Sequence, residues 1–391
     1  MIIMSIRILY LSIIPFLTAF ITVCFAHPTF LKLAKRYSAY DEPGARKLQK
    51  NSVPVMGGIA VFLGIVSGMF TSVIVLDCSS LFIYMMAATL MLYIGLIDDL
   101  TGLPVRMRFL SEAVVIVVAI YFSHIVINDV GGLWGIEHLG PWLSVPLTVV
   151  ACVGIINAIN LIDGVDGLSS GFTIVACALF GWLFYKSGDI LMLELAVVII
   201  GAMIPFFLHN VFGLKTKMYI GDSGALVNGI ILAFFAVRTM QYGTPANSCT
   251  DADLSMAAVS LAILSEPVFD AVRVALVRIF KGRPPFSPDN LHLHHAFIRC
   301  HFSHAGTTVC ILFLNVLVVA VWWLSYMLGA GVGTQVCIVV AMGLLITWGT
   351  YALLEHARRG IVYRIIMRLS LASHWHRHDL MTKVQHLIDK L

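Results

Sequence analysis

The sequence predicts an all-α integral membrane protein that crosses the bilayer many times. Of its 391 residues 59% are hydrophobic and only 12% are charged, about half the charged fraction of a soluble domain. The mean hydropathy is +0.93, and the apolar residues form blocks near the ~20 residues that a helix needs to span the hydrocarbon core. These blocks are continuous rather than alternating, which excludes a transmembrane β-barrel. The net charge of +4 is too small to indicate a nucleic-acid partner.

About eleven transmembrane helices are expected, and together they form one domain over residues 1–355. The segment at 225–240 is the least certain of them. Their approximate ranges are 8–26, 54–76, 80–97, 109–127, 141–162, 168–185, 190–212, 225–240, 255–280, 306–328 and 335–355. The remaining residues, 356–391, mix arginines with apolar side chains. They predict a basic cytoplasmic amphipathic tail on anionic lipid, or a positive segment that only fixes topology.

The basic residues predict the side of each loop. Twenty Lys and Arg fall on one set of alternate loops and the tail, whereas the opposite loops carry only Lys186. By the positive-inside rule the rich side is cytoplasmic, which places the N-terminus outside and the tail inside. The twenty are Lys32, Lys35, Arg36, Arg46, Lys47, Lys50, Arg106, Arg108, Lys215, Lys217, Lys281, Arg283, Arg299, Arg358, Arg359, Arg364, Arg368, Arg377, Lys383 and Lys390.

The eight cysteines show no CxxC spacing, and most fall inside apolar segments, as small core residues do. Cys78 and Cys249 lie in two loops of the outer side, so a disulfide between them is an open alternative.

Polar residues concentrate on the cytoplasmic side in four clusters, of which the first is the pair Asp98-Asp99. Adjacent carboxylates repel each other, and in a low-dielectric setting at least one would protonate unless a cation compensates. Mg²⁺ suits such sparse acidic ligands because it keeps waters and substrate phosphates. The alternative is that the pair only marks a helix end at the interface.

In the second cluster Asn160, Asp163 and Asp166 recur every three residues. On a helix this spacing places them on one face, directed to one point. Gly164 and Gly167 allow close backbone approach or a break in the helix. A solvated turn between two spans is the competing interpretation.

The third cluster is Tyr219-Ile-Gly-Asp222-Ser-Gly, directly before a predicted helix. Backbone amides at a helix start can hold phosphate, and Asp222 can reach a metal ion. A simple helix N-cap by Asp222 or Ser223 is equally consistent with the pattern.

The fourth cluster contains His292, His294 and His295, with Arg278, Lys281 and Arg283 just upstream. Imidazoles can hydrogen-bond a pyrophosphate or shuttle a proton. The acidic loops elsewhere favour magnesium rather than zinc chemistry. Together the clusters predict a phosphate-rich substrate held between metal and cationic side chains.

With these motifs the chain resembles the polyprenyl-phosphate N-acetylhexosamine-1-phosphate transferases, the MraY/WecA superfamily. The resemblance also includes Asp41-Glu-Pro and Val55-Met-Gly-Gly58, and it runs through most of the chain in one order. The His-x-His-His form after Pro-Phe-Ser-Pro is similar to the branch that uses N-acetylglucosamine phosphate. Two positions depart from the family pattern: Gly102 replaces a third acid after the aspartate pair, and Ala225 follows Gly224.

The resemblance implies transfer of N-acetylglucosamine 1-phosphate from a UDP-sugar to undecaprenyl phosphate, with release of UMP, directly or through a phospho-aspartyl intermediate. It implies a bacterial inner-membrane enzyme with its active site facing the cytoplasm, which starts a cell-surface glycan such as O-antigen, lipopolysaccharide or cell-wall polymer. Another UDP-N-acetylhexosamine donor, a homodimer, and a secondary transporter of an anionic sugar or nucleotide remain open alternatives.

The resemblance also implies roles for single residues. Asp222, with Asp99 and Asp163, would hold Mg²⁺ or Mn²⁺, and Tyr219 would stack on uracil. Asn160, Asp163 and Asp166 would line the nucleotide pocket, and Asp98 is a candidate base. The cationic residues that would hold the diphosphate or lipid phosphate are Arg108, Arg278, His292, His294 and His295.

Overall fold

A computed structural model of the chain describes residues 2–41, 52–76, 78, 80–133, 135–243, 254–287, 289–357, 359–374 and 379–389. The helices are α1 (Ile2–Arg36), α2 (Gly57–Leu76), α3 (Leu81–Thr101), α4 (Val105–Ser123), α5 (Pro141–Leu161), α6 (Leu168–Ser187), α7 (Ile190–Phe212), α8 (Gly221–Met240), α9 (Met256–Ile263), α10 (Ser265–Phe280), α11 (Leu293–Arg299), α12 (His304–Met327), α13 (Val332–Leu344), α14 (Thr350–His356), α15 (Gly360–Ala372) and α16 (Asp379–Ile388).

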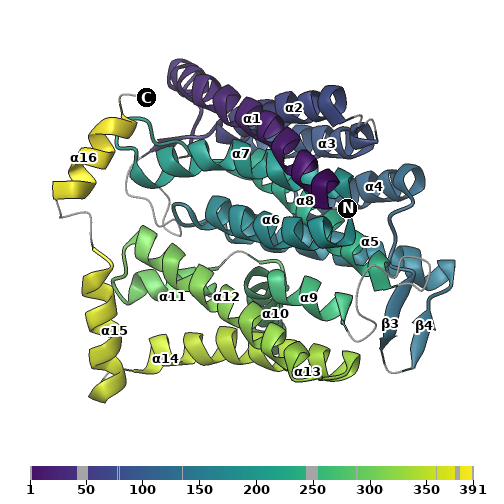
Figure 1. Ribbon diagram of the computed structural model, residues 1–391. Helices are drawn as coiled ribbons and strands as arrows, with labels where there is room; N and C mark the ends of the chain where they lie inside the picture. Colours follow the sequence, from purple (N-terminus) through teal and green to yellow (C-terminus); the bar gives the residue numbers. More distant parts are fainter. Residues whose placement is uncertain are drawn as a thin grey trace.

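The long helices lie side by side, as expected of a polytopic membrane protein (Figure 1). A helix satisfies its own backbone hydrogen bonds, which is what lipid requires of a spanning segment. Two short antiparallel pairs accompany the helices: β1 (Tyr40–Asp41) with β2 (Val53–Pro54), and β3 (Asp129–Leu133) with β4 (Ile136–His138). The β3–β4 hairpin and helices α15 and α16 lie at opposite ends of the bundle (Figure 1).

Helix α8 lies at the centre, against α2, α3, α5 and α6, and nearly all of its side chains are buried. Glycines allow its first turn to approach its neighbours closely. A methyl group added to Gly58 of α2 would lie 2.4 Å from the Gly224 backbone nitrogen, and one on Gly95 of α3 would lie 2.3 Å from the Ser223 Cα. Backbone contact at this distance brings three chain segments together at the start of α8.

Nine helices of the described chain are long and apolar enough to cross a membrane, so the count of eleven is not confirmed. The expected span at 225–240 is confirmed as helix α8. The expected span at 109–127 is α4, which begins at Val105 and carries Arg106, Arg108 and Glu112. It is not among the nine.

The prediction of one continuous helix over 255–280 is wrong, because the chain breaks at Leu264 between α9 and α10. Asn315 of α12 satisfies the backbone at this break. Its amide nitrogen donates to the Ile263 carbonyl at 3.0 Å, and its Oδ1 accepts from the Glu266 N–H at 3.0 Å and the Ser265 hydroxyl at 2.9 Å. Asn315 therefore replaces the helical hydrogen bonds that the break removes.

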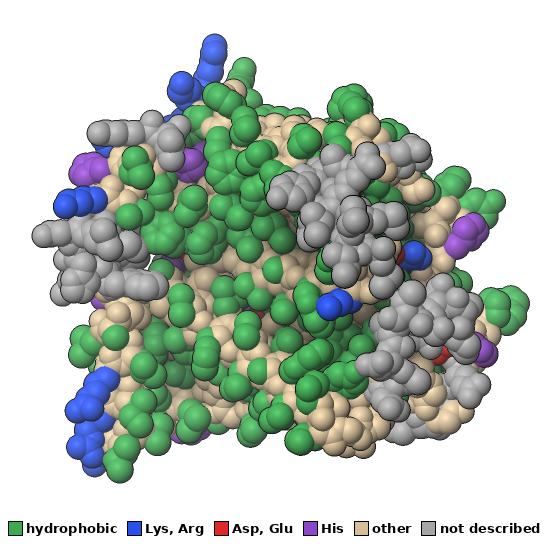
Figure 2. All heavy atoms as spheres, in the orientation of Figure 1, with side chains coloured by type: hydrophobic (Ala, Val, Ile, Leu, Met, Phe, Trp, Pro, Cys, Tyr) green, Lys and Arg blue, Asp and Glu red, His purple; other side chains and the backbone are tan. Residues whose placement is uncertain are grey.

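The basic tail forms the helices α15 and α16. In Figure 1, α15 runs across the direction of the spanning helices, and Figure 2 shows Lys and Arg side chains at that edge. Ile361 and Leu369 of α15 are exposed, as in a helix that presents apolar side chains to a membrane surface. Its contact with anionic lipid stays a prediction. Cys249, the proposed partner of Cys78, lies outside the described residues.

Candidate active site at the start of α8

The first turn of α8 joins the first and third polar clusters. Both carboxylate oxygens of Asp99 accept backbone N–H groups of α8, from Asp222 at 2.8 Å and from Ser223 at 3.1 Å. The pattern predicted that these amides could hold phosphate or be capped locally. The structure instead caps them with an acid from α3, because Gly95 lets the two backbones meet.

Asp222 connects this turn to the second cluster, since its Oδ1 accepts from the Asn160 amide at 2.5 Å. Asn160 is in the last turn of α5, whereas Asp163 and Asp166 lie beyond its end at Leu161. The expectation that the three share one helical face is therefore wrong: Asp163 and Asp166 lie in a turn, but the turn is not simply solvated, since Asp166 is largely buried and paired with Lys217 and His304. Asp163 is half-buried in that turn.

Asp166 faces a different group of side chains. Its Oδ2 lies 2.5 Å from Lys217 Nζ and 2.9 Å from His304 Nδ1. Burial alone would raise the pKa of Asp166, but the hydrogen bonds and charges of His304 and Lys217 outweigh it and hold the pKa below its usual value. The Lys217 ammonium also lies 5.7 Å from the centre of the Tyr219 ring. Lys217 and His304 were not predicted as site residues.

Tyr219 is held in place by its own backbone. Its N–H donates to the Pro54 carbonyl at 2.9 Å, and its carbonyl accepts from the Gly57 N–H at 2.9 Å. The Val55-Met-Gly-Gly58 motif thus supports the segment that leads into α8.

Asp98 is buried and binds different groups from those that Asp99 binds. Its carboxylate accepts from the Leu103 N–H at 2.7 Å and from the Arg108 guanidinium at 3.1 Å. Arg108 also donates to the Asn157 side-chain carbonyl at 3.1 Å, and the Asn157 amide donates to buried Glu112 at 2.6 Å. Asp98 therefore orients Arg108. Asn157 and Glu112 were missed because each occurs singly within an apolar block.

The histidine cluster adjoins the turn after α5. Rings of His292 and His294 stack at 5.7 Å, those of His294 and His295 lie 4.3 Å apart, and a methyl group on Gly164 would lie 2.8 Å from His294 Nε2. Burial and the neighbouring charges of His292 and Arg299 lower the pKa of His295 to about 4, and burial also lowers the pKa of His294. Both imidazoles are therefore neutral at pH 7.

His292 is oriented by an acid that the sequence did not single out. Its Nδ1 lies 2.9 Å from buried Asp270, which also pairs with Arg273 at 2.7 Å. The other ring nitrogen, Nε2, is buried with no hydrogen-bond partner among the described residues. A carboxylate on one side of an imidazole and an unsatisfied nitrogen on the other is the arrangement of a histidine held ready for a ligand.

Arg278 is engaged within the protein. It forms a bidentate pair with Asp289 at 2.7 and 2.9 Å and donates to the Pro285 carbonyl at 2.6 Å. Burial alone would raise the pKa of Asp289, but its bonds to Arg278 outweigh this and lower it. These bonds hold Asp289 and the Pro285 carbonyl against α10.

Beside these residues lies a groove of about 1010 Å³, lined by α4, α5, α8, α9, α10 and the 285–287 segment. Arg108, Asn160 and Arg278 line it on the side of the acidic residues. Its remaining lining is largely apolar and continues to Ile127 and Met240, near the opposite ends of α4 and α8. The groove therefore joins the polar site to the apolar interior of the helix bundle.

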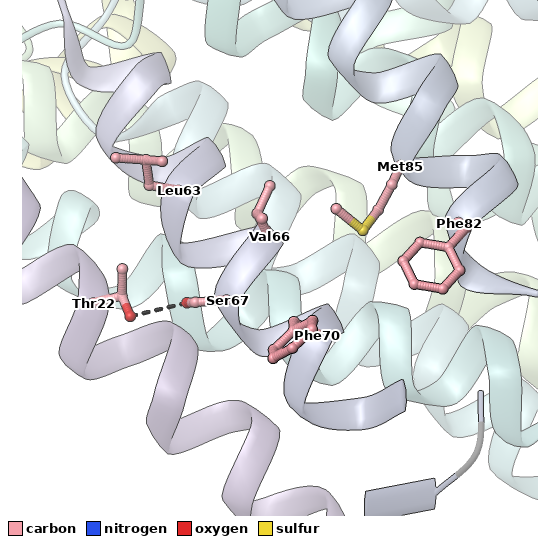
Figure 3. Close-up of a pocket in the computed structure, with 7 residues that line it drawn as sticks. All are labelled: Thr22, Leu63, Val66, Ser67, Phe70, Phe82 and Met85. Carbon is pink, nitrogen blue, oxygen red and sulfur yellow. Dashed lines mark hydrogen bonds between the residues drawn. The ribbon is translucent and has the colours of Figure 1, made fainter. Parts of the chain in front are cut away.

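A second cavity of about 380 Å³ lies elsewhere, between α1, α2 and α3. Its side chains, among them Leu63, Phe70 and Met85, are apolar except for Thr22 and Ser67, which hydrogen-bond each other at 2.9 Å (Figure 3). Because it has no titratable lining residue, it offers no group for the chemistry of the site.

The acidic residues of the site offer few ligands for a metal ion. The described chain contains no group of three or more His, Cys, Asp or Glu side chains placed to hold one ion. Asp99, one of the predicted ligands, already accepts two N–H groups. Asp163 and Asp222, whose Oδ1 also accepts from Asn160, would supply the carboxylate oxygens, and this small set fits Mg²⁺, which takes one or two carboxylates and completes its shell with waters and substrate phosphates.

Residues 81–240 match the model of glycosyl transferase family 4, a range that includes α3, α5 and α8. The chain is 31% identical over 288 residues to the undecaprenyl-phosphate alpha-N-acetylglucosaminyl 1-phosphate transferase of Escherichia coli O157:H7, covering 72% of this chain and 74% of that protein.

Two further relatives carry related names. The decaprenyl-phosphate N-acetylglucosaminephosphotransferase of Mycobacterium tuberculosis (strain CDC 1551 / Oshkosh) is 32% identical over 371 residues, 89% of each chain. The probable undecaprenyl-phosphate N-acetylglucosaminyl 1-phosphate transferase of Bacillus subtilis (strain 168) is 29% identical over 300 residues, 76% of this chain and 80% of that protein. The chain belongs to the polyprenyl-phosphate N-acetylglucosamine-1-phosphate transferases, the WecA type of the MraY/WecA superfamily.

Proposed function

We propose that this protein transfers N-acetylglucosamine 1-phosphate from its UDP-sugar to the phosphate of a membrane polyprenol. An oxygen of the lipid phosphate attacks the β-phosphorus of the donor, the bond to the α-phosphate oxygen breaks, and UMP leaves. The product is a lipid-linked pyrophosphate sugar that starts a surface glycan. The observation that carries the proposal is the groove that begins at Arg108, Asn160 and Arg278 and continues as an apolar channel.

The groove suits the lipid acceptor. A polyprenyl phosphate combines an anionic head with a long apolar chain, and the groove has cationic and amide side chains on one side and apolar lining on the other. Arg108 is the group that would receive the lipid phosphate, since Asp98, Asn157 and Glu112 fix its guanidinium. Held there, the acceptor oxygen needs little further activation, because a phosphate is largely ionised near neutral pH.

The donor belongs on the other side of the acidic cluster. Tyr219 offers a ring for the uracil to stack on, and Lys217, His292 and His304 offer hydrogen-bond donors to a diphosphate. Asp222 and Asp163 would hold Mg²⁺, with Mn²⁺ as substitute, and the ion would neutralise the charge that develops between donor and acceptor. Positioning of two anions by these side chains supplies the rest of the catalysis.

The location follows from the substrates. UDP-sugars are cytosolic, so the end of the bundle that carries the site, α15 and α16 would face the cytoplasm, and a bacterial inner membrane would hold the chain. A homodimer is compatible with this arrangement.

The experiment is a donor and acceptor panel with purified protein in detergent. UDP-N-acetylglucosamine should release UMP only when undecaprenyl phosphate is present, and UDP-N-acetylgalactosamine should be the poorer donor. Excess chelator should stop turnover, and Mg²⁺ should restore it. UMP release without lipid acceptor, or none with both substrates and Mg²⁺, would exclude the proposed reaction.

A further inference from the structure

The C-terminal helix α16 contacts the segment that leads into the site. Asp389, just after α16, accepts three hydrogen bonds on one carboxylate oxygen: from the backbone N–H of Leu214 at 3.0 Å, the backbone N–H of Lys215 at 3.1 Å and the hydroxyl of Thr216 at 3.1 Å. These residues lie more than 170 positions earlier in the chain. The contact is therefore a specific clasp between the tail and the 213–217 segment.

The other side of the same segment is held by α1 and α7. The Thr216 hydroxyl lies 3.1 Å from His209 Nδ1, and the Thr216 carbonyl lies 2.8 Å from His27 Nε2. The two imidazole rings stack at 4.3 Å. Gly213 makes the turn possible, since a methyl group there would lie 2.4 Å from the Thr216 hydroxyl.

The clasp lies immediately before two donor-side residues. Lys217 follows Thr216 directly and pairs with Asp166, and Tyr219 comes two residues later. A displacement of Thr216 by even 1 Å would shift Lys217 and the ring of Tyr219, since no flexible stretch separates them. Misplacement of this size is enough to reduce catalysis strongly.

The Asp389 carboxylate is a charged hydrogen-bond acceptor, which makes its contact with the 214–216 segment stronger than a contact between neutral groups. Burial acts to raise its pKa, but the N–H and O–H donors of the 214–216 segment outweigh this and hold the pKa below its ordinary value. The carboxylate is thus ionised at neutral pH, where charge-assisted hydrogen bonds are about twice as strong as neutral ones.

From these contacts we infer that Asp389 is a positioning residue: the C-terminal helix clasps the 213–217 segment and thereby orients Lys217 and Tyr219 toward the UDP-sugar. The inference rests on the proposed function for its link to the donor. The clasp acts on donor binding rather than on the lipid, because the groove lies among α4, α5, α8, α9 and α10.

The first test measures the segment without using activity. Hydrogen exchange on the full-length protein in detergent should be about tenfold faster at Leu214 and Lys215 in Asp389→Ala than in wild type, because their shared acceptor is removed. Exchange should also rise at Tyr219, whose N–H donates to Pro54. His386→Ala, an exposed change on the same helix, should leave all three unchanged. Faster exchange confined to 214 and 215 would overturn the inference.

The second test uses steady-state kinetics. Asp389→Ala should raise the KM for UDP-N-acetylglucosamine about fivefold and leave the KM for undecaprenyl phosphate unchanged, since it loses charge-assisted bonds only on the donor side. Asp389→Asn keeps an acceptor oxygen and should recover most of the donor affinity. An equal rise in both KM values, or none in either, would contradict a positioning role. If the wild-type protein transfers no sugar phosphate, the proposed function fails. The positioning role of Asp389 is then still decided by whether hydrogen exchange at Tyr219 rises in Asp389→Ala.

Discussion

Asp222 is the residue on which the acidic clusters converge. Its backbone N–H binds Asp99 and its carboxylate binds Asn160, so three segments meet at one side chain. A cap of α8 needs only the Asp99 contact, which is made to the backbone and does not depend on the Asp222 carboxylate. The Asp222 carboxylate, which accepts from Asn160, is therefore not part of this cap, and we propose a role for it in the reaction.

We expect Asp222→Asn to lower kcat at least tenfold, a barrier increase of about 1.4 kcal/mol or more, while folded protein is kept. The amide removes the charge that would hold Mg²⁺ but keeps the size of the side chain. Initial rates of UMP release and the elution profile in detergent measure the two effects. Glu355→Gln, which removes a half-buried acid paired with Arg299, is the control and should stay near wild type. Activity of Asp222→Asn above a tenth of wild type would argue against a metal-binding role.

Gly58 shows how a residue without a side chain determines the site. A methyl group there would meet only backbone: the Gly224 nitrogen at 2.4 Å, its Cα at 2.7 Å and the Ile220 carbonyl oxygen at 2.7 Å. Backbone cannot rotate away as a flexible side chain can. Helices α2 and α8 would have to separate.

Gly58→Ala should therefore cost about 1–3 kcal/mol of stability, the usual range for overpacking, and should lower activity by displacing Asp222. Thermal unfolding in detergent, followed with the transfer assay, measures both. The matched change is Gly349→Ala, where the nearest atom would be Leu345 Cδ1 at 3.6 Å, an ordinary contact. Equal unfolding midpoints for Gly58→Ala and wild type would mean that the helices accommodate the methyl group.

At the scale of elements, the break between α9 and α10 redirects the chain along the groove. α10 contributes Val268, Val272 and Ala275 to the lining, and Asn315 is the side chain that satisfies the broken backbone. The buried Asn side chain makes three hydrogen bonds there, so its replacement leaves three polar groups unsatisfied.

For Asn315→Leu we expect a loss of about 1–3 kcal/mol for each group left unpaired, seen as a lower thermal midpoint in detergent. We also expect a higher KM for undecaprenyl phosphate, because α10 would shift against the groove. Ser325→Ala on the same helix removes a bond made only to Trp322 within α12 and should change neither quantity. If Asn315→Leu is destabilised but its KM for undecaprenyl phosphate is unchanged, the break between α9 and α10 contributes to stability and not to lipid binding.

For the whole molecule, orientation is the property on which the proposed function depends. Thr101 lies at the end of α3, beside the aspartate pair, and Arg283 lies after α10, before the histidine cluster. Both are exposed. Lys186 and Leu328 lie at the ends of α6 and α12 and are also exposed. If the basic loops are cytoplasmic, these two pairs face different compartments.

Single cysteines at these positions, in a chain lacking the native ones, test this orientation. Thr101→Cys and Arg283→Cys should resist a membrane-impermeant thiol reagent in intact cells and react after permeabilisation. Lys186→Cys and Leu328→Cys should react before it. Labelling of Thr101→Cys and Arg283→Cys from opposite sides would mean that the two halves of the site do not face one compartment.

The sequence by itself determined the membrane class, most helices and the residues of the four polar clusters. These properties are local: a run of apolar residues must form a helix in lipid, and clustered acids and histidines are costly there unless they have a function. The family motifs added the reaction, since Asp222, Asn160 and the histidines occur in a recognisable order. Because these signals are local, the sequence identified the segments that carry the site residues. It did not show which side chains of those segments contact one another.

Only the tertiary structure decided which groups act on one another. It assigned Asp99 to the first turn of α8, Arg278 to Asp289, His292 to Asp270 and Asp166 to Lys217 and His304. It also broke the expected 255–280 helix and ended α5 before Asp163. The reason is physical: Asn315 is 50 residues from the break that it stabilises, and Asp99 is 123 residues from the helix that it caps. Such contacts depend on how closely the backbones pack, and hydropathy and spacing contain no information about that distance.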